Sequence, residues 1–253
     1  MRERILSFEV GSHPDVEVRI ASGHIHVDEG AAGTVNVSIS ASNPDKLPVE
    51  QFRDHIQIGE EGRLRGSYRI RLEVPAGTDI STGVASGNVD VRGPVGDITA
   101  RSASGDVDIE EASGRVEVKM ASGDVAIRRA GGDTRVVSAS GDVKIAEAAE
   151  DCSVATASGS IDLGTMSGGL NVKTASGNVL VKRFEGDTLI AKSVSGRLDL
   201  RIPSGRRVEL DIRTLSGRVD LPSPTDSPAP SGGREIDVRA KSVSGNINIG
   251  RAD

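Results

Sequence analysis

A Ser-Gly dipeptide recurs through the middle of this chain at a fixed interval, and this repeat constrains the fold more than any other feature. Successive Ser-Gly pairs lie 9 or 18 residues apart. A short fixed period is typical of a solenoid, in which each repeat packs on its neighbours. The pairs are Ser86-Gly87, Ser104-Gly105, Ser113-Gly114, Ser122-Gly123, Ser140-Gly141, Ser158-Gly159, Ser167-Gly168 and Ser176-Gly177.

Apolar and polar residues alternate after each repeat glycine. The second and fourth residues after the glycine are large and aliphatic, whereas the residues between them are mostly polar. This alternation with period two predicts one short strand per nonapeptide, with the aliphatic side chains inward. The residues expected to line the core are Val107, Ile109, Val125, Ile127, Val143, Ile145, Ile161 and Leu163.

A repeat of nine residues cannot stay in phase with a strand of period two, so each repeat must contain a bend that resets its two faces. Glycine suits such a bend because it tolerates positive φ. The bend lies either at the glycine or five to seven residues after it, where Glu110-Glu111 and Arg128-Arg129 stand. The expected turn glycines are Gly87, Gly105, Gly123, Gly141, Gly159 and Gly177.

Two nonapeptides make a natural coil of 18 residues, because the full Ala-Ser-Gly signature is strongest at steps of 18. We therefore predict an all-β fold, a parallel β-helix or β-solenoid with 18-residue coils made of two nonapeptides. Stacked coils would place equivalent strands about 4.8 Å apart. One coil buries too little apolar surface to offset its conformational entropy, so the stack should be cooperative and its ends should need caps.

The expected organisation is one continuous solenoid domain with four regions. Residues 1–80 show strand-like alternation without the nonapeptide, and we expect them to form irregular β coils that cap the stack. Residues 81–220 form the regular solenoid. A loop rich in Pro, Gly and Ser follows over residues 221–233. Residues 234–253 return to the repeat and are expected to form the final coil and C-terminal cap.

Composition narrows the class of protein. The formal net charge is −6 with both signs interspersed, which argues against nucleic acid or an anionic membrane as the main partner. The N-terminus lacks the apolar run of a signal peptide, and no apolar stretch is long enough to span a bilayer, so we expect a cytoplasmic protein without membrane insertion. The single cysteine, Cys152, replaces a core valine and should be a buried structural thiol.

Three segments together resemble a bacterial family of β-strand-repeat domains of unknown function. These segments are VEVRIASGHIHV over 16–27, IRLEVPAGTDI over 70–80 and ASGDVDI over 103–109. The family is labelled "putative adhesins" and is related to the head-GIN-domain adhesins. The resemblance implies a β-solenoid in the cytoplasm or at the cell envelope, with no catalytic residues. A looser likeness is to bactofilins, bacterial β-solenoids that form filaments through their ends.

Two groups of side chains could hold a metal ion. Asp106, Asp124 and Asp142 would line up from coil to coil, and a cation such as calcium would relieve their repulsion. The interpretation we favour is that they brace their own turns by local hydrogen bonds. His24, His26 and Asp28 could bind a transition metal, but solvated side chains on an outward face are the favoured interpretation.

Neither the serines nor the fold points to catalysis. We interpret the repeat serines as a structural column whose hydroxyls hydrogen-bond from coil to coil. No histidine follows His55, so a Ser-His-Asp nucleophile would need a histidine from the N-terminal region. Glycan-processing β-helices need long insertions and sugar-binding side chains, and residues 84–200 are almost free of insertions. The serines of the column are Ser86, Ser104, Ser122, Ser140, Ser158 and Ser176.

Two functional classes remain. The preferred one is a non-catalytic structural or interaction scaffold without cofactors, which binds a protein partner or self-associates through the exposed edges of its terminal coils. The alternative is a monomeric binding module that recognises a cell-envelope component or a regulatory protein. Effective caps at both ends would favour the alternative.

Overall fold

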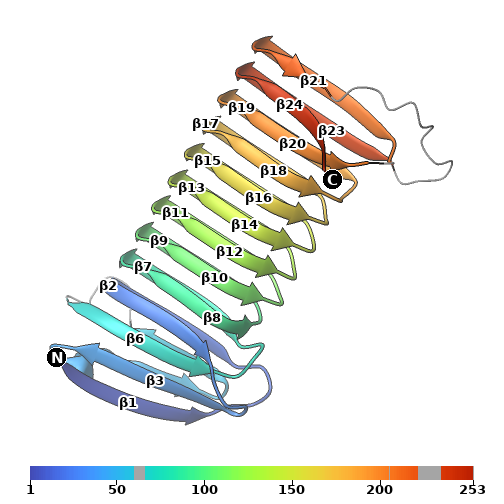
Figure 1. The fold of residues 1–253 in the computed structure, drawn as a ribbon. Helices are drawn as coiled ribbons and strands as arrows, with labels where there is room; N and C mark the ends of the chain where they lie inside the picture. Colours follow the sequence, from blue (N-terminus) through green and yellow to red (C-terminus); the bar gives the residue numbers. More distant parts are fainter. Residues whose placement is uncertain (60–65, 205, 222–234, 253) are drawn as a thin grey trace. The chain divides into compact units, whose positions relative to one another are not determined.

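The computed structural model describes residues 1–59, 66–204, 206–221 and 235–252. The expected Pro-rich loop lies, apart from Leu221, outside the described residues. The chain forms two compact units, Met1–Gly132 and Asp133–Asp253. Each unit is a stack of β coils, as Figure 1 shows.

The regular coils of the first unit each contribute one strand to each of two sheets. Val107 pairs with Val125, and Ile98 pairs with Val116, so equivalent residues lie 18 positions apart in parallel strands. The predicted β-solenoid with 18-residue coils is thereby confirmed. One sheet contains β7 (Asp79–Ser86), β9 (Ile98–Ser104) and β11 (Val116–Ser122), and the other contains β8 (Val89–Val95), β10 (Val107–Ala112) and β12 (Val125–Ala130).

The N-terminal part of the first unit is irregular. β2 (Asp15–Glu29) belongs to both sheets, because its first half pairs with β7 and its second half with β8. Among the described residues, three antiparallel pairings lie at this end, β1 with β3, β3 with β6, and β4 with β5. The remaining bounds are β1 (Arg2–Glu9), β3 (Thr34–Ala41), the 3-10 turn η1 (Pro44–Lys46), β4 (Val49–Phe52), β5 (His55–Gly59) and β6 (Ser67–Val74).

The second unit repeats the two-sheet coil. Cys152 pairs with Leu170 at the regular interval, whereas Leu170 pairs with Leu189 because one extra residue lies in the corner after Phe184. One sheet contains β13 (Thr134–Ser140), β15 (Cys152–Ser158), β17 (Leu170–Ser176) and β19 (Thr188–Ser195). The other contains β14 (Val143–Ala148), β16 (Ile161–Met166), β18 (Val179–Phe184) and β20 (Leu198–Pro203).

The last two coils of the second unit stack in the reverse of their sequence order. β23 (Ile236–Ser244) lies between β19 and β21 (Val208–Ser216), and β24 (Ile247–Ala252) lies between β20 and β22 (Val219–Asp220). The expectation that residues 234–253 close the stack is therefore corrected. The inward Ile236 and Val238 are 0% exposed, whereas Leu210 of β21 is 37% exposed. The more apolar coil thus lies inside and the more polar one outermost.

The core lies between the two sheets of each unit. All eight residues predicted to line it are at most 2% exposed. The bend that brings the inward and outward faces of the strands back into phase occurs at both of the positions suggested by the sequence. In β10, the consecutive Glu110 and Glu111 are both outside the core before Ala112 returns to it. In β9, Ala103 and Ser104 of the Ala-Ser-Gly corner are exposed, and the buried residue is Ser102.

The turn glycines are required by both conformation and space. All six expected turn glycines have positive φ. At Gly105 φ is +124°, and a Cβ atom would lie 2.2 Å from the carbonyl oxygen of Gly87 in the preceding coil. At Gly159 the corresponding distance to the Gly141 oxygen is 2.1 Å. Adjacent coils therefore approach so closely at this corner that only glycine fits.

Candidate functional site

The predicted aspartate column is a set of hydrogen-bond acceptors between coils. Asp106 Oδ1 accepts a hydrogen bond from the backbone N–H of Asp124 at 3.0 Å, and Asn88 Oδ1 accepts one from Asp106 N–H at 3.1 Å. In the second unit, Asp142 Oδ1 accepts from Ser160 N–H at 2.7 Å. These side chains therefore brace the next coil, where we had expected them to brace their own turns.

The opposite corner of each coil is stabilised by the same kind of hydrogen bond between coils. Asp97 Oδ1 accepts a hydrogen bond from Arg115 N–H at 2.7 Å, and Asp151 Oδ1 accepts one from Gly169 N–H at 2.8 Å. Across the described residues, no group of three His, Cys, Asp or Glu side chains is arranged to hold a metal ion. The Asp and Asn side chains at both corners therefore hold adjacent coils together by hydrogen bonds, and this role needs no cation.

The two predicted histidines both point outward from β2, but their surroundings differ. His24 is exposed, whereas His26 is half-buried and lies between two carboxylates. Its Nε2 atom is 2.9 Å from Asp28 Oδ1, and its Nδ1 atom is 3.2 Å from Asp90 Oδ2. Arg71 also contacts Asp28, with 2.8 Å from its Nε atom to Oδ2. This is a network of polar contacts in which His26 and Asp28 take part and His24 does not.

The charges around Asp90 alter its acidity. Partial burial acts to raise the pKa of Asp90, but the hydrogen bond and positive charge of Arg92, together with His26, outweigh that effect and lower it below 3.8. Arg92 Nε lies 2.8 Å from Asp90 Oδ1. The lowered pKa keeps Asp90 ionised at neutral pH, so its contact with Arg92 joins two full charges.

The serine column differs from the expectation. The six serines of the predicted column are exposed, and among the described residues their hydroxyls form no hydrogen bonds from coil to coil, whereas Ser113 at the other corner donates from Oγ to the Val95 carbonyl at 2.9 Å. Backbone carbonyls of the column accept hydrogen bonds between coils instead: the N–H of Gly87 donates to the Ser104 carbonyl at 2.8 Å. The serines stand at the outer rim of the corner, so their hydroxyls face solvent while the main chain makes the contact.

A second column of hydroxyls, which sequence reasoning missed, is buried inside the same corner. It occupies the position three residues before the turn glycine. Thr156 Oγ1 donates to the Ser158 carbonyl at 3.0 Å, and Ser138 Oγ donates to the Ser140 carbonyl at 3.0 Å. The signal was present in the sequence as a Ser or Thr two residues before a Ser-Gly pair. The column contains Ser102, Ser138, Thr156, Thr174, Ser193 and Ser242.

The single cysteine faces the interior, as expected. Cys152 is 2% exposed and pairs with Thr134 and Leu170 on its two sides. Burial raises the pKa of its thiol to about 12. Because the thiolate is the reactive form, this cysteine is a core residue and not a nucleophile.

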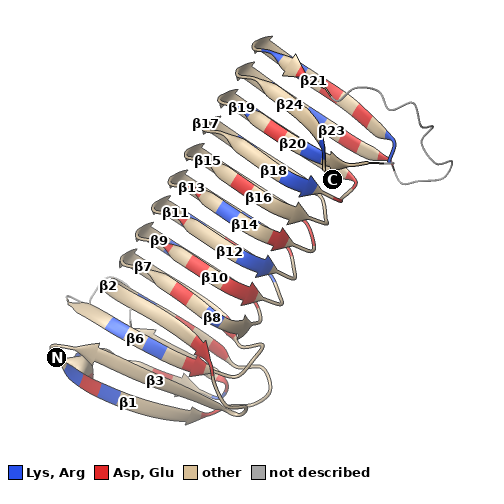
Figure 2. Ribbon diagram, in the orientation of Figure 1, with Lys and Arg blue, Asp and Glu red and all other residues tan. Residues whose placement is uncertain are grey.

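Charges on the outer surface of the second sheet are paired between coils. Arg128 Nη2 lies 3.0 Å from Glu110 Oε1, and Arg129 Nη1 lies 2.9 Å from Glu111 Oε2. Figure 2 shows the acidic end of β10 beside the basic end of β12. In the second unit, Lys182 Nζ lies 2.8 Å from Asp162 Oδ1. This surface is electrostatically compensated.

The outermost coil of the second unit has an open strand edge and exposed apolar side chains. β21 pairs on one side with β23, and within the described part of the chain no strand pairs with its other edge. Its neighbouring apolar side chains are uncovered: Leu215 is 86% exposed, Leu221 53% and Val219 37%. This open edge, which we call the β21 edge, consists of residues 208–221.

The fold and its surfaces define a class of protein, a β-solenoid that offers sheet faces and one open coil edge. No catalytic constellation is assembled among the residues described above. The chain belongs to the Toastrack DUF4097 family, which it matches over residues 31–250. The family of unknown function indicated by the sequence is thereby confirmed. No curated protein matches the chain significantly.

Solved structures of bacterial proteins are similar to this chain over nearly its whole length. A "putative lipid binding protein" from Parabacteroides distasonis is 13% identical, with 98% of this chain and 96% of that chain covered and a TM-score of 0.46. A "putative adhesin" from Bacteroides fragilis is 13% identical, with 98% and 97% covered and a TM-score of 0.36. A "putative cell adhesion protein" from Clostridium sporogenes is 13% identical, with 99% of both chains covered and a TM-score of 0.28.

Neither the family description nor the names of these proteins specify an enzymatic activity. In the described ranges, no helix has the length and apolar character needed to cross a bilayer.

Proposed function

We propose that this protein is a non-catalytic interaction scaffold that associates with a second copy of itself through the β21 edge. The observation that carries the proposal is the incomplete last coil. Its strand has one hydrogen-bonded neighbour, and its inward Leu210 remains 37% exposed although the equivalent Val238 of β23 is 0% exposed. An open strand edge beside uncovered apolar side chains is a template for another strand.

The sequence of β21 is complementary to itself. An antiparallel pairing with a two-fold axis at Ile212 would place Asp211 of each copy opposite Arg213 of the other. The same register would place Leu210 opposite Thr214, and Ile212 opposite its own equivalent, so that inward residues meet inward residues. Opposite charges in directly facing positions stabilise such a pair. Asp211 and Arg213 already contact each other within one chain, with 2.9 Å between Oδ1 and Nε.

The edge at the N-terminal end of the first unit is closed differently. Arg4 takes an inward position in β1, and its Nη1 atom donates to the Leu47 carbonyl at 3.0 Å. Leu47, the C-cap residue that follows η1, is 0% exposed. A charged inward residue and a covering turn make this edge a poor template. A two-fold contact at one end closes on itself, so we expect dimers and not filaments.

Light scattering coupled to size-exclusion chromatography tests the proposal. The wild-type protein should have the mass of a dimer at micromolar concentrations. Asp211→Arg should shift the equilibrium to monomers, because two arginines would then face each other on both sides of the axis. The exchanged variant Asp211→Arg/Arg213→Asp should restore the dimer, because opposite charges face each other again.

Ile5→Lys on β1 is the matched control. Ile5 is 71% exposed on the other edge strand, and its replacement should leave the dimer intact. The proposal fails if the wild-type protein is a monomer throughout the concentration range, or if Asp211→Arg dimerises as well as the wild type. Thermal unfolding of each variant shows whether a change in mass reflects lost association or lost folding.

The second candidate is a monomeric module that binds an envelope component or a regulatory protein. The closed N-terminal edge favours it, because a stack with effective caps would present only its sheet faces. A monomeric wild-type protein in the same experiment would support this candidate.

A further inference from the structure

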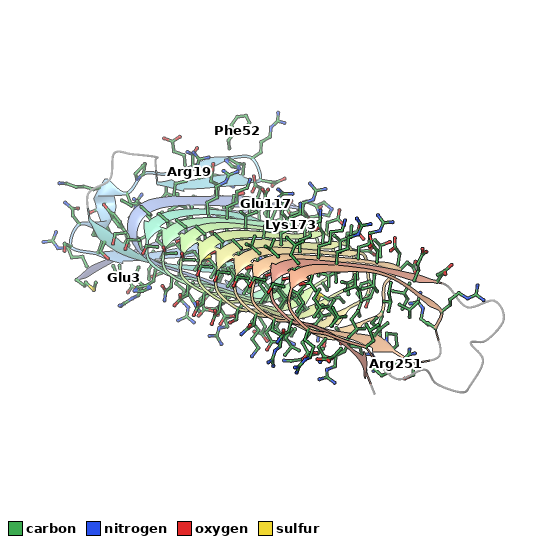
Figure 3. All side chains as sticks on the ribbon, turned by 90° about the horizontal axis from the view of Figure 1, so that it is seen from above. Glu3, Arg19, Phe52, Glu117, Lys173 and Arg251 are labelled. Carbon is green, nitrogen blue, oxygen red and sulfur yellow. The ribbon has the colours of Figure 1, made fainter. Side chains whose placement is uncertain are left out.

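One sheet of the second unit carries a column of four basic side chains on its outer surface. Lys173 of β17 pairs in register with Lys192 of β19, Lys192 with Lys241 of β23, and Lys241 with Arg213 of β21. Figure 3 shows Lys173 projecting outward from the ribbon. Neighbouring strands lie about 4.8 Å apart, so the column extends for about 14 Å across the strands.

Acidic side chains neutralise only one of the four members of this column. Within the described residues, Lys173, Lys192 and Lys241 form no ion pair, and Arg213 pairs with Asp211 of its own strand. The three ammonium groups therefore repel one another. We call Lys173, Lys192, Lys241 and Arg213 the basic column.

The first unit shows how the fold compensates such charges elsewhere. Arg19 and Lys119 also occupy outward positions in the corresponding sheet. Arg19 is paired with Glu17, with 2.5 Å between Nη2 and Oε1, and Lys119 is paired with Glu117. Arg19 and Glu117 are labelled in Figure 3. The absence of such partners beside the three lysines is thus a property of this part of the second unit.

An apolar stripe runs beside the basic column, two residues further along the same strands. It consists of Ala175, Val194, Val243 and Leu215, where Val194 is 53% exposed, Val243 46% and Leu215 86%. A shallow hollow of about 460 Å³ adjoins it and is lined in part by Ala155, Ala157, Lys173 and Lys192. Contiguous apolar side chains on an outer sheet surface mark a contact region.

We propose that this face binds an amphipathic α-helix of another protein, one with an acidic ridge beside an apolar ridge. Side chains one turn apart on a helix are separated by about 5.4 Å, close to the strand spacing of about 4.8 Å. Over the four strands the two spacings differ by about 2 Å in total, which lysine side chains can absorb.

An extended acidic peptide fits less well. Its side chains on one face repeat at about 6.6–6.8 Å and fall out of step with the lysines after one interval. It also could not add to the sheet, because the outer surface presents side chains and not an open backbone edge. In the helical complex, carboxylates meet the basic column and the apolar ridge packs on the stripe, the general mode of a helix lying in a groove.

Fluorescence anisotropy with synthetic peptides tests this inference. The probe is a capped peptide of about 14 residues that forms a helix with glutamates on one ridge and leucines on the next. It should bind the wild-type protein and gain helicity by circular dichroism on binding. Lys192→Glu/Lys241→Glu should weaken binding by about tenfold or more, because like charges would then face the glutamates.

Lys144→Glu/Lys182→Glu is the matched control, because it makes the same charge change on the other sheet of the same unit. It should bind the peptide as the wild type does. The inference is overturned if the control variant loses binding equally, or if a scrambled peptide or unstructured polyglutamate binds as tightly as the helix. The dimer contact is tested separately: the peptide should bind Asp211→Arg, whatever the oligomeric state of that variant.

Discussion

The carboxylate of Asp106 accepts a hydrogen bond from the backbone N–H of Asp124, which lies at the equivalent position in the following coil, at 3.0 Å. The same relationship joins Asp97 to Arg115 in the other corner, at 2.7 Å. At a corner the strand pairing is interrupted, so backbone N–H groups there lack a partner from the sheet. An Asp or Asn side chain from the preceding coil supplies that partner.

Removing this acceptor should lower stability. We expect Asp106→Ala to decrease the free energy of unfolding by about 1 kcal/mol, the usual net value of such a hydrogen bond. Asp106→Asn keeps an oxygen in the accepting position and should stay close to the wild type. Urea unfolding of the three proteins measures the differences. Equal stability of Asp106→Ala and wild type would show that solvent satisfies the Asp124 N–H equally well.

Calcium should not change the stability of the folded protein. The Asx oxygens that a cation would need already accept backbone hydrogen bonds, and calcium requires six to eight oxygen ligands. We therefore expect the same melting temperature in EDTA and in millimolar calcium. A rise in melting temperature with calcium, absent with magnesium, would contradict this assignment of the column.

The turn glycines should not tolerate a methyl group. Gly105→Ala forces alanine to φ near +124° and a contact of 2.2 Å with the Gly87 oxygen, so we expect a loss of at least 1–3 kcal/mol, on the order given for strained backbone. Gly83→Ala in β7 is the control. A Cβ atom there meets only Arg19 Cγ, at 3.6 Å, and should leave stability unchanged or slightly higher. Similar melting temperatures for the two variants would refute the steric argument.

The inside and outside of the coil can be separated at two adjacent residues. Val125 is 1% exposed, so Val125→Asp would bury a carboxylate without a partner and should abolish cooperative unfolding. Asp124 is exposed, and Asp124→Asn keeps its shape and one side-chain oxygen, so its stability should match the wild type. Thermal unfolding followed by circular dichroism compares them. If both variants melted alike, the assignment of faces would be wrong.

Acid should weaken the network around Asp90 in a defined pH range. Arg92 and His26 lower the pKa of Asp90 in the folded protein, so the folded state favours the ionised carboxylate. This stabilisation is fully present above the ordinary pKa of 3.8 and is lost as the pH falls through the lowered value. Arg92→Ala removes the main cause of the shift, and the NMR titration of Asp90 should then move to higher pH.

Asp90→Asn provides the matching stability measurement. It has no carboxylate to titrate, so its urea midpoint should fall less steeply with acid than that of the wild type. An unchanged titration of Asp90 in Arg92→Ala would show that Arg92 does not control its pKa.

Most of the fold could be predicted from the sequence, because the repeat is a pattern of residues that are close together along the chain. Val107 and Ile109 recur at fixed offsets from a glycine, and their alternation is sufficient to assign strands, faces and coil length. The corner was harder to predict. Ala103 and Ser102 are adjacent small residues, and only the conformation of the bend decides that the serine is buried and the alanine exposed.

The basic column and the β21 edge could not be predicted from the periodicity of the sequence alone. The basic column has a sequence signal, because Lys173, Lys192 and Lys241 each stand four residues before a repeat glycine. Their alignment with Arg213, however, depends on which coil stacks on which. The β21 edge could not be predicted either, because sequence order suggests that the last coil is the outermost.

That reversed order has a consequence for biosynthesis. Residues 208–220 leave the ribosome before residues 236–252, yet they pair in the folded protein with those later residues and not with the coil synthesised before them. Until β23 and β24 emerge, β19 and β20 present an unfilled edge, and β21 has no correct neighbour. If the two early coils paired directly during that interval, that contact would have to break before β23 and β24 could take their places between them. This end of the protein is thus where a slow folding step, and recognition of the nascent chain by a chaperone, would be concentrated.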